Sequence, residues 1–191
     1  MKRVIPLVLC GLSLAAATTW ANGQGEPTTQ DDATQVQQLN QQVQTLRQAA
    51  GLTPISGPGV VLELQDKPRK SQKSTPIAIV GIVHDYDILQ VVNELRAANA
   101  EAIAINGVRL TNYTPVRCVG PTILVDGQPI GLPVKVEAVG NPDSLHRALS
   151  VKGGLLTYFQ QSGPDVRLSR AAKLHLPAAS NTPFFSFGKP E

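Results

Sequence analysis

Residues 91–110, VVNELRAANAEAIAINGVRL, decide the fold, because they contain the end of an amphipathic helix, a tight stop, an apolar strand and a two-residue turn. From Asp85 to Asn99, apolar residues recur at helical spacing, which predicts a helix with one face in the core. These residues are Ile88, Val91, Val92, Leu95 and Ala98. Asp85 or Asp87 is expected to accept hydrogen bonds from N–H groups of the first turn. Asn99 predicts a left-handed stop.

The strand and turn that follow predict a hairpin. Residues 102–105 are apolar on both alternating faces, which favours a strand covered on both sides or central in its sheet. Asn106 and Gly107 come next, and both tolerate the positive φ that a type I′ turn requires. Residues 108–111 would pair back on the first strand.

Three longer stretches carry a family resemblance. NELRAANAEAIAINGVRL, CVGPTILVDGQPIGLPVKVEAVGNPDSL and GPGVVLELQD resemble the YlxW-like bacterial envelope proteins, known as domain of unknown function 881, from about Leu39 to Pro177. Asn99 stands where that family usually has Gly, and both residues reach the left-handed region. The resemblance implies an N-terminal membrane segment or signal, a short coil and a ferredoxin-like domain outside the cytoplasm. It implies no established activity, and some members are encoded near cell-division genes.

Residues 1–21 predict a signal peptide or a membrane anchor. Lys2 and Arg3 precede an apolar run without charge, and residues 19–21 offer a small-x-small cleavage site. Cleavage would release a secreted protein, whereas an uncleaved run of about 18–20 residues can span a bilayer. Cys10 does not indicate lipidation, because Leu9 precedes it where a small residue is required. The protein is therefore expected to be exported, in a periplasmic or other extracytoplasmic location.

Charge and cysteine content argue against a nucleic-acid-binding protein and against a disulfide-stabilised one. The net charge is 17 − 14 = +3, and removing Lys2 and Arg3 leaves 15 − 14 = +1, which does not favour nucleic-acid binding. Outside the N-terminal segment the chain has one cysteine, Cys118, so no intrachain disulfide is expected there. We interpret Cys118 as a small buried hydrophobe and not as a reactive thiol.

Two segments separate the N-terminus from the domain. Residues 22–34 are polar and predict a linker. Residues 35–50 predict a short coiled-coil helix, because apolar side chains step by three and four. These side chains are Val36, Leu39, Val43, Leu46 and Ala50. The stripe predicts a homodimer through Val36, Leu39, Val43 and Leu46 or a helix packed on its own domain, and two heptads do not decide between them.

Residues 54–177 predict an α+β domain, a ferredoxin-like β-α-β-β-α-β sandwich with extra hairpins. The expected strands are 60–64, 102–105, 108–111, 116–119, 122–125 and 134–139, with two more signals at Val166/Leu168 and Leu174/Leu176. Asp126-Gly127 predicts a second hairpin turn, and Asn141-Pro142 predicts a helix start. An apolar run covers residues 76–83. The basic stretch 67–73 is expected to be a mobile loop, and residues 178–191 a flexible tail containing Phe184, Phe185 and Phe187.

Catalytic chemistry finds no support in the residue pattern. His84, His146 and His175 share no metal-ligand spacing, and no hydrolase, phosphate-loop or dinucleotide motif occurs. His84 and Asp85 together with Asp87 are the best candidate for a cation, but a helix cap also explains both carboxylates. We therefore expect no enzyme activity, no catalytic, cofactor-binding or metal-binding residues, and no cofactor.

Two functions remain. The first is a non-enzymatic interaction module of the cell envelope, linked to cell division or envelope organisation. Its partners would be other envelope proteins or a second copy, with no nucleic acid and with membrane association only through the N-terminal segment. The alternative is a regulatory domain that binds a small ligand between sheet and helices, which rests on fold analogy.

Overall fold

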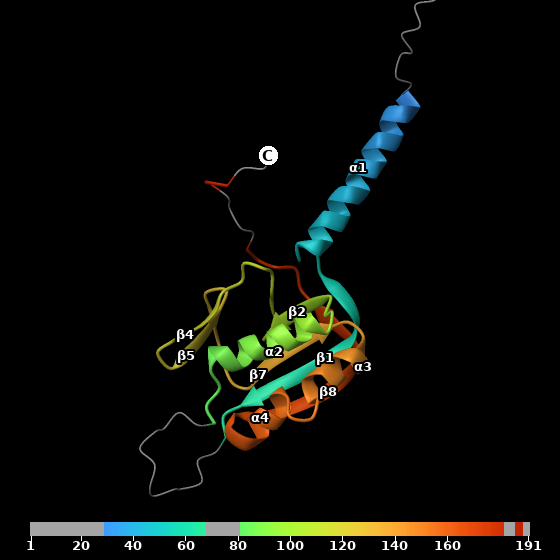
Figure 1. Cartoon of the computed structure of the whole chain (residues 1–191). Helices are drawn as coiled ribbons and strands as arrows, with labels where there is room; N and C mark the ends of the chain where they lie inside the picture. Colours follow the sequence, from blue (N-terminus) through green and yellow to red (C-terminus); the bar gives the residue numbers. More distant parts are fainter. Residues whose placement is uncertain (1–28, 68–80, 182–185, 189–191) are drawn as a thin grey trace, which may run out of the picture. The chain divides into compact units, whose positions relative to one another are not determined.

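The computed structural model describes residues 29–67, 81–181 and 186–188, and within them the protein is α+β, with four helices and eight strands (Figure 1). The chain divides into two compact units, residues 1–39 and 40–191, and each is described by itself. The expected signal or anchor at residues 1–21 lies outside the described residues. In the described ranges, no helix combines the length and apolar character that crossing a bilayer requires.

Helix α1 runs over Thr29–Ala49 and is longer than predicted. The expected boundary at residue 35 was wrong, because residues 29–34 of the predicted linker are helical. Asp32 lies near the positive N-terminal end of this helix, and Arg47 lies in its last turn. An acidic residue at the start and a basic residue at the end both stabilise a helix through its dipole. The polar composition of residues 22–34 had predicted a linker and did not indicate this.

The main sheet has five antiparallel strands in the order β3-β2-β7-β1-β8. Their bounds are β1 Ile55–Gln65, β2 Ala102–Ile105, β3 Val108–Arg109, β7 Val134–Val139 and β8 Asp165–Leu176. Leu62 in β1 pairs with Val136 of β7 on one side and with Leu168 of β8 on the other. The strand that begins the domain is therefore an interior strand, paired on both sides.

Two strand predictions needed correction. The first strand, predicted as 60–64, begins at Ile55, because Gly57 and Gly59 belong to the ladder with β8 across a bulge. The two signals near the C-terminus form one strand, β8, because β1 is long enough to pair along both of them. Glycines that looked like a linker are thus part of the sheet.

Helices α2 (Asp85–Ala97), α3 (Pro142–Ser150) and α4 (Leu155–Ser162) lie on one face of this sheet (Figure 1). The predicted inner face of α2 is confirmed, since Ile88, Val91, Val92 and Leu95 are buried. Further core side chains come from the sheet and the other helices: Val60, Leu62, Leu64, Ile103, Ile105, Val136, Leu145, Leu149 and Phe159. Aliphatic burial on this face is the main stabilising term.

The two predicted hairpin turns, the stop at Asn99 and the cap at Asn141 are confirmed. Asn106 and Gly107 have φ values of 46° and 82°, as a type I′ turn requires. Asp126 and Gly127 have the same positive signs, and Asn99 has φ 61° after α2. The side chain of Asn141 accepts hydrogen bonds from the N–H groups of Asp143 and Ser144 at the start of α3. These local choices set the ends of the hairpins and helices.

A second sheet and a second apolar cluster complete the domain. Strands β4 (Val116–Val119), β5 (Thr122–Val125) and β6 (Gln128–Ile130) form a three-stranded antiparallel sheet inserted between β3 and β7. A smaller cluster holds Ala102, Ala104, Val139, Leu174 and Leu176. Ala102 and Ala104 alternate along β2 with Ile103 and Ile105 of the main core, so β2 has apolar side chains on both faces, as its sequence predicted.

Candidate functional site

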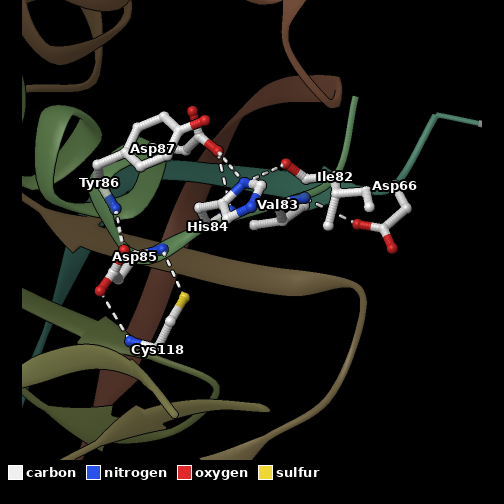
Figure 2. A network of polar contacts seen from close by, with 8 residues as sticks. All are labelled: Asp66, Ile82, Val83, His84, Asp85, Tyr86, Asp87 and Cys118. Carbon is white, nitrogen blue, oxygen red and sulfur yellow. Dashed lines mark hydrogen bonds and ion pairs between the residues drawn. The ribbon is translucent and has the colours of Figure 1, made fainter. Parts of the chain in front are cut away.

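A polar network lies at the start of α2 (Figure 2). The N–H of His84 donates to Asp87 Oδ2 at 2.9 Å, and His84 Nδ1 donates to the carbonyl of Ile82 at 2.9 Å. The N–H of Val83 donates to Asp66 Oδ1 at 2.8 Å. His84, and not either aspartate, is the residue that precedes the first helical turn. As expected, Asp85 accepts an N–H of the first turn, from Tyr86 at 2.9 Å, whereas Asp87 accepts the N–H of His84, one residue before the helix.

Asp85 connects α2 to β4. Its Oδ2 accepts the N–H of Cys118 at 2.7 Å, and its own N–H donates to Cys118 Sγ at 3.3 Å (Figure 2). The bond from the Cys118 N–H lowers the pKa of Asp85, and burial opposes this shift. Asp85 therefore links two segments that are 33 residues apart in the sequence.

We expect Asp85→Asn to destabilise the domain by about 1 kcal/mol at pH 7, because a charged acceptor is replaced by a neutral one. A carboxylate whose folded pKa is depressed contributes stability above its unfolded value of about 3.8 and loses it as pH falls through the folded pKa. The difference between wild type and variant should therefore shrink below about pH 4. Urea unfolding at pH 7 and pH 3 measures it.

Asp165→Asn is the matched control, because Asp165 is exposed at the start of β8. It should change the unfolding free energy by less than about 0.5 kcal/mol at both pH values. An Asp85→Asn penalty that stays constant between pH 7 and pH 3 would show that the negative charge is not what stabilises this contact.

Cys118 was predicted to be a small buried hydrophobe, and it is half-buried against the main core. Its side chain packs beside the main core while Sγ also accepts the Asp85 N–H. Burial raises the pKa of the Cys118 thiol, and the nearby carboxylates add to this effect. A thiol with a raised pKa holds less thiolate at neutral pH, which agrees with a packing role.

Asp87 is only 1% exposed, and desolvation raises its pKa. Its position is fixed by the His84 N–H, and the His84 ring stacks on that of Tyr86 with centroids 5.1 Å apart. Within the described ranges, no three side chains of the metal-binding types gather at one point. The network in Figure 2 thus satisfies the backbone at the start of α2 and leaves its carboxylates engaged.

The other two histidines lie elsewhere. His146 Nδ1 lies 3.4 Å from Ser150 Oγ within α3, and His175 Nδ1 in β8 lies 2.8 Å from Ser56 Oγ in β1. Neither hydrogen-bonds to the network at His84, so the structure does not bring the three together.

A partly open pocket of about 420 Å³ lies at the β3 edge of the main sheet. Its wall includes Arg109, which is only 5% exposed. Arg109 Nη1 donates to the carbonyls of Thr53 at 3.2 Å and Pro177 at 3.1 Å. Sequence reasoning placed Arg109 in a returning strand and assigned it no role. The only signal for it was a charged residue within the second strand of an otherwise apolar hairpin.

A second, more open hollow of about 570 Å³ lies between the end of α2 and the start of α3. It is lined by Ala98, Asn99, Glu101, Asn141, Ser144, Arg147 and Ala148. The Asn141 oxygen there already caps α3. This oxygen is therefore already engaged by the backbone of α3.

The apolar stripe of α1 is exposed. Val36, Leu39, Val43 and Leu46 are between 49% and 68% exposed. Apolar side chains in regular heptad positions on an exposed helix face are typical of coiled-coil seams.

Two surface predictions have partial outcomes. Lys67, assigned to the mobile basic loop, instead donates from Nζ to the carbonyls of Gln160 at 3.1 Å and Phe159 at 3.5 Å, near the C-terminus of α4. A lysine ammonium group interacts favourably with carbonyls at the C-terminus of a helix, because that end of the helix dipole is negative. Residues 68–73, Phe184 and Phe185 lie outside the described residues, whereas Phe187 is almost fully exposed.

The start of the predicted tail is hydrogen-bonded to the domain. The N–H of Ala179 donates to the carbonyl of Gly51 at 2.9 Å, and Asn181 Nδ2 donates to Asp126 Oδ2 at 2.7 Å. The chain therefore remains attached to the domain beyond β8, at least as far as Asn181.

Comparisons with known proteins agree on one family. The protein-family model described as "Bacterial protein of unknown function (DUF881)" matches residues 42–189 of this chain. UPF0749 protein YlxW of Bacillus subtilis is 38% identical over 110 residues, covering 58% of this chain and 47% of that protein. UPF0749 protein Rv1823 of Mycobacterium tuberculosis is 33% identical over 159 residues, covering 78% of this chain and 51% of that protein.

A solved structure shares the fold. The crystal structure of an uncharacterized conserved protein from Mycobacterium tuberculosis superposes with a TM-score of 0.62 at 26% identity, covering 78% of this chain and 99% of that one. The chain spans about half the length of the curated relatives it matches.

Proposed function

The chain belongs to the DUF881 family of bacterial proteins of unknown function, and on that premise we propose that it is a non-enzymatic interaction module of the cell envelope, which pairs with a second copy of itself through α1. The observation that carries this proposal is the exposure of all four seam residues, Val36, Leu39, Val43 and Leu46. Exposed apolar side chains at heptad spacing are stabilised when a second helix covers them.

The flanks of the stripe support self-association. They are rich in Gln and Asn, and the charged residues between Thr29 and Ala49 are Asp31, Asp32 and Arg47. Two copies side by side would therefore bring few like charges together along the seam. A seam of two heptads is marginal in free solution, and tethering both copies to one membrane would raise their effective concentration.

A ferredoxin-like core and an exported location are further parts of the proposal. The main elements follow one another as β1, α2, β2, β7, α3 and β8, and the four strands among them lie in the order β2-β7-β1-β8 in the sheet. This arrangement, with the helices on one face, supports a β-α-β-β-α-β sandwich. Lys2 and Arg3 ahead of an apolar run support export.

The non-enzymatic part is supported by what the best chemical candidates already do. Asp87 holds the His84 N–H, and Asp85 holds the Cys118 N–H. Groups committed to backbone bonds inside a helix start are poorly placed to act as an acid or base on a substrate.

Sedimentation equilibrium of the purified full chain tests the dimer. The wild type is expected to show concentration-dependent dimers, and the double variant Leu39→Asp, Leu46→Asp to associate at least about a hundredfold more weakly, because two buried leucines are lost from each helix. The domain core is not touched by these changes, so circular dichroism should still report a folded protein.

The matched control is Gln41→Asp, Gln48→Asp, which adds the same charge to the opposite face of α1. It should leave the dimer largely intact. A wild type that stays monomeric at high concentration, or a control that weakens association as much as the leucine variant, would contradict pairing through this stripe.

A further inference from the structure

The guanidinium of Arg109 is buried without a neutralising partner. Nη1 donates to the carbonyls of Thr53 and Pro177, while Nε is covered and has no acceptor. Across the described ranges, no carboxylate lies within ion-pair distance of it. Burial lowers the pKa of Arg109, which reflects the cost of keeping this charge away from water. A buried donor left without an acceptor costs about 1–3 kcal/mol.

The geometry of the side chain defines which edge remains for a ligand. The two carbonyls occupy Nη1, so the edge formed by Nε–H and Nη2–H is the one without a hydrogen bond to the described residues. Two parallel N–H groups on this edge match the two oxygens of a carboxylate or of a phosphate. A neutral molecule or a cation would not compensate the buried charge.

The adjacent pocket has the size and the lining for a small molecule. Its volume of about 420 Å³ falls within the usual range for ligand sites. Leu52, Ala102 and Leu110 contribute apolar wall, and Arg96 brings a second cation. Glu101 is the acidic residue among the lining side chains, so the arginines outnumber it.

Gly51 leaves space beside the unpaired nitrogen. A Cβ built on Gly51 would lie 3.8 Å from Arg109 Nε and 3.4 Å from Thr111 Cγ2. No side chain of residue 51 therefore blocks approach to this edge. Because Nε itself is covered, a ligand oxygen reaches it only after a small outward shift of the atoms around it.

We propose that this pocket binds a small molecule carrying a carboxylate or phosphate group, with its oxygens on the Nε–Nη2 edge of Arg109 and its body against the wall formed by Leu52, Ala102 and Leu110. The oxyanion supplies the acceptor that Nε lacks and neutralises the buried charge. None of the four seam residues of α1 lines this pocket, so the test of this site and the test of the dimer can fail separately.

NMR titration of the ¹⁵N-labelled full chain tests the site, with the Arg109 Nε–H resonance assigned through bonds. The probes are sodium phosphate and sodium acetate, added at constant ionic strength against sodium chloride. A saturable shift of this resonance with phosphate alone identifies a phosphate site, and with acetate alone a carboxylate site. Saturation with both identifies a general oxyanion site. No shift, or a non-saturating one equal to that with chloride, overturns the proposal.

Arg109→Lys keeps the positive charge and removes the two parallel N–H groups of the guanidinium. The variant should therefore bind the anion that saturates the wild type at least about tenfold more weakly. Arg167→Lys, an exposed residue of β8, is the control and should bind as the wild type does. Equal affinity of folded Arg109→Lys and wild type would overturn the assignment to this edge. If Arg109→Lys does not fold, the wild-type titration decides the question.

Discussion

Gly59→Ala is expected to destabilise the domain by about 3 kcal/mol or more, at the upper end of overpacking effects. Gly59 lies in the interior strand β1, between Val139 of β7 and Ala171 of β8. A Cβ built there would overlap the carbonyl oxygen and carbon of Ala138, and would lie 3.0 Å from Leu174 Cδ1. The obstacle is backbone held by a ladder on both sides, so no rotamer change relieves it. Urea unfolding measures the loss.

Gly131→Ala provides the control for Gly59→Ala. Gly131 precedes β7, and a Cβ built on it meets no atom within 4 Å. Its effect should stay within about 0.5 kcal/mol. Similar unfolding midpoints for the two alanine variants would show that β1 and β7 are farther apart at Gly59 than described.

Phe159→Ala is expected to cost about 3–5 kcal/mol, the usual range for removing a buried aromatic ring. Phe159 lies in α4, is fully buried and belongs to the main core. Its surroundings are tight, since a Cβ built on Gly163 would come within 2.6 Å of its Cδ1. Because α4 has only eight residues, packing through this ring and not helix propensity keeps it in place.

Tyr158→Ala is the matched control, because Tyr158 is the neighbouring aromatic residue of the same helix and is exposed. It should cost less than about 1 kcal/mol. The comparison uses denaturant midpoints of the two variants at equal protein concentration. A Phe159→Ala variant as stable as Tyr158→Ala would mean that α4 does not contribute its ring to the core.

The candidate chemistry was only partly predictable. The sequence identified Asp85 and Asp87 as acceptors at a helix start, since capping acts within one turn. It did not identify Cys118 as the partner of Asp85, because that bond joins segments 33 residues apart. Lys67 was misassigned for the same reason, since its acceptors in α4 are more than 90 residues away.

The sequence by itself determined the features that depend on neighbouring residues. The Asn106-Gly107 turn and the cap at Asn141 follow from backbone preferences and local hydrogen bonds, and the inner face of α2 follows from helical periodicity. Asn99 follows α2 in the left-handed conformation, as expected, because asparagine tolerates that conformation better than most residues do. Such signals act within a few residues and need no knowledge of the partner.

The tertiary structure alone decided which distant segments meet. It extended β1 through Gly57 and Gly59, because β8 is long enough to pair there and because only glycine fits against the Ala138 carbonyl. It also placed Arg109 against carbonyls 56 and 68 residues away, at Thr53 and Pro177. Steric fit and buried charge are properties of the assembled sheet, so no local pattern in the chain encodes them.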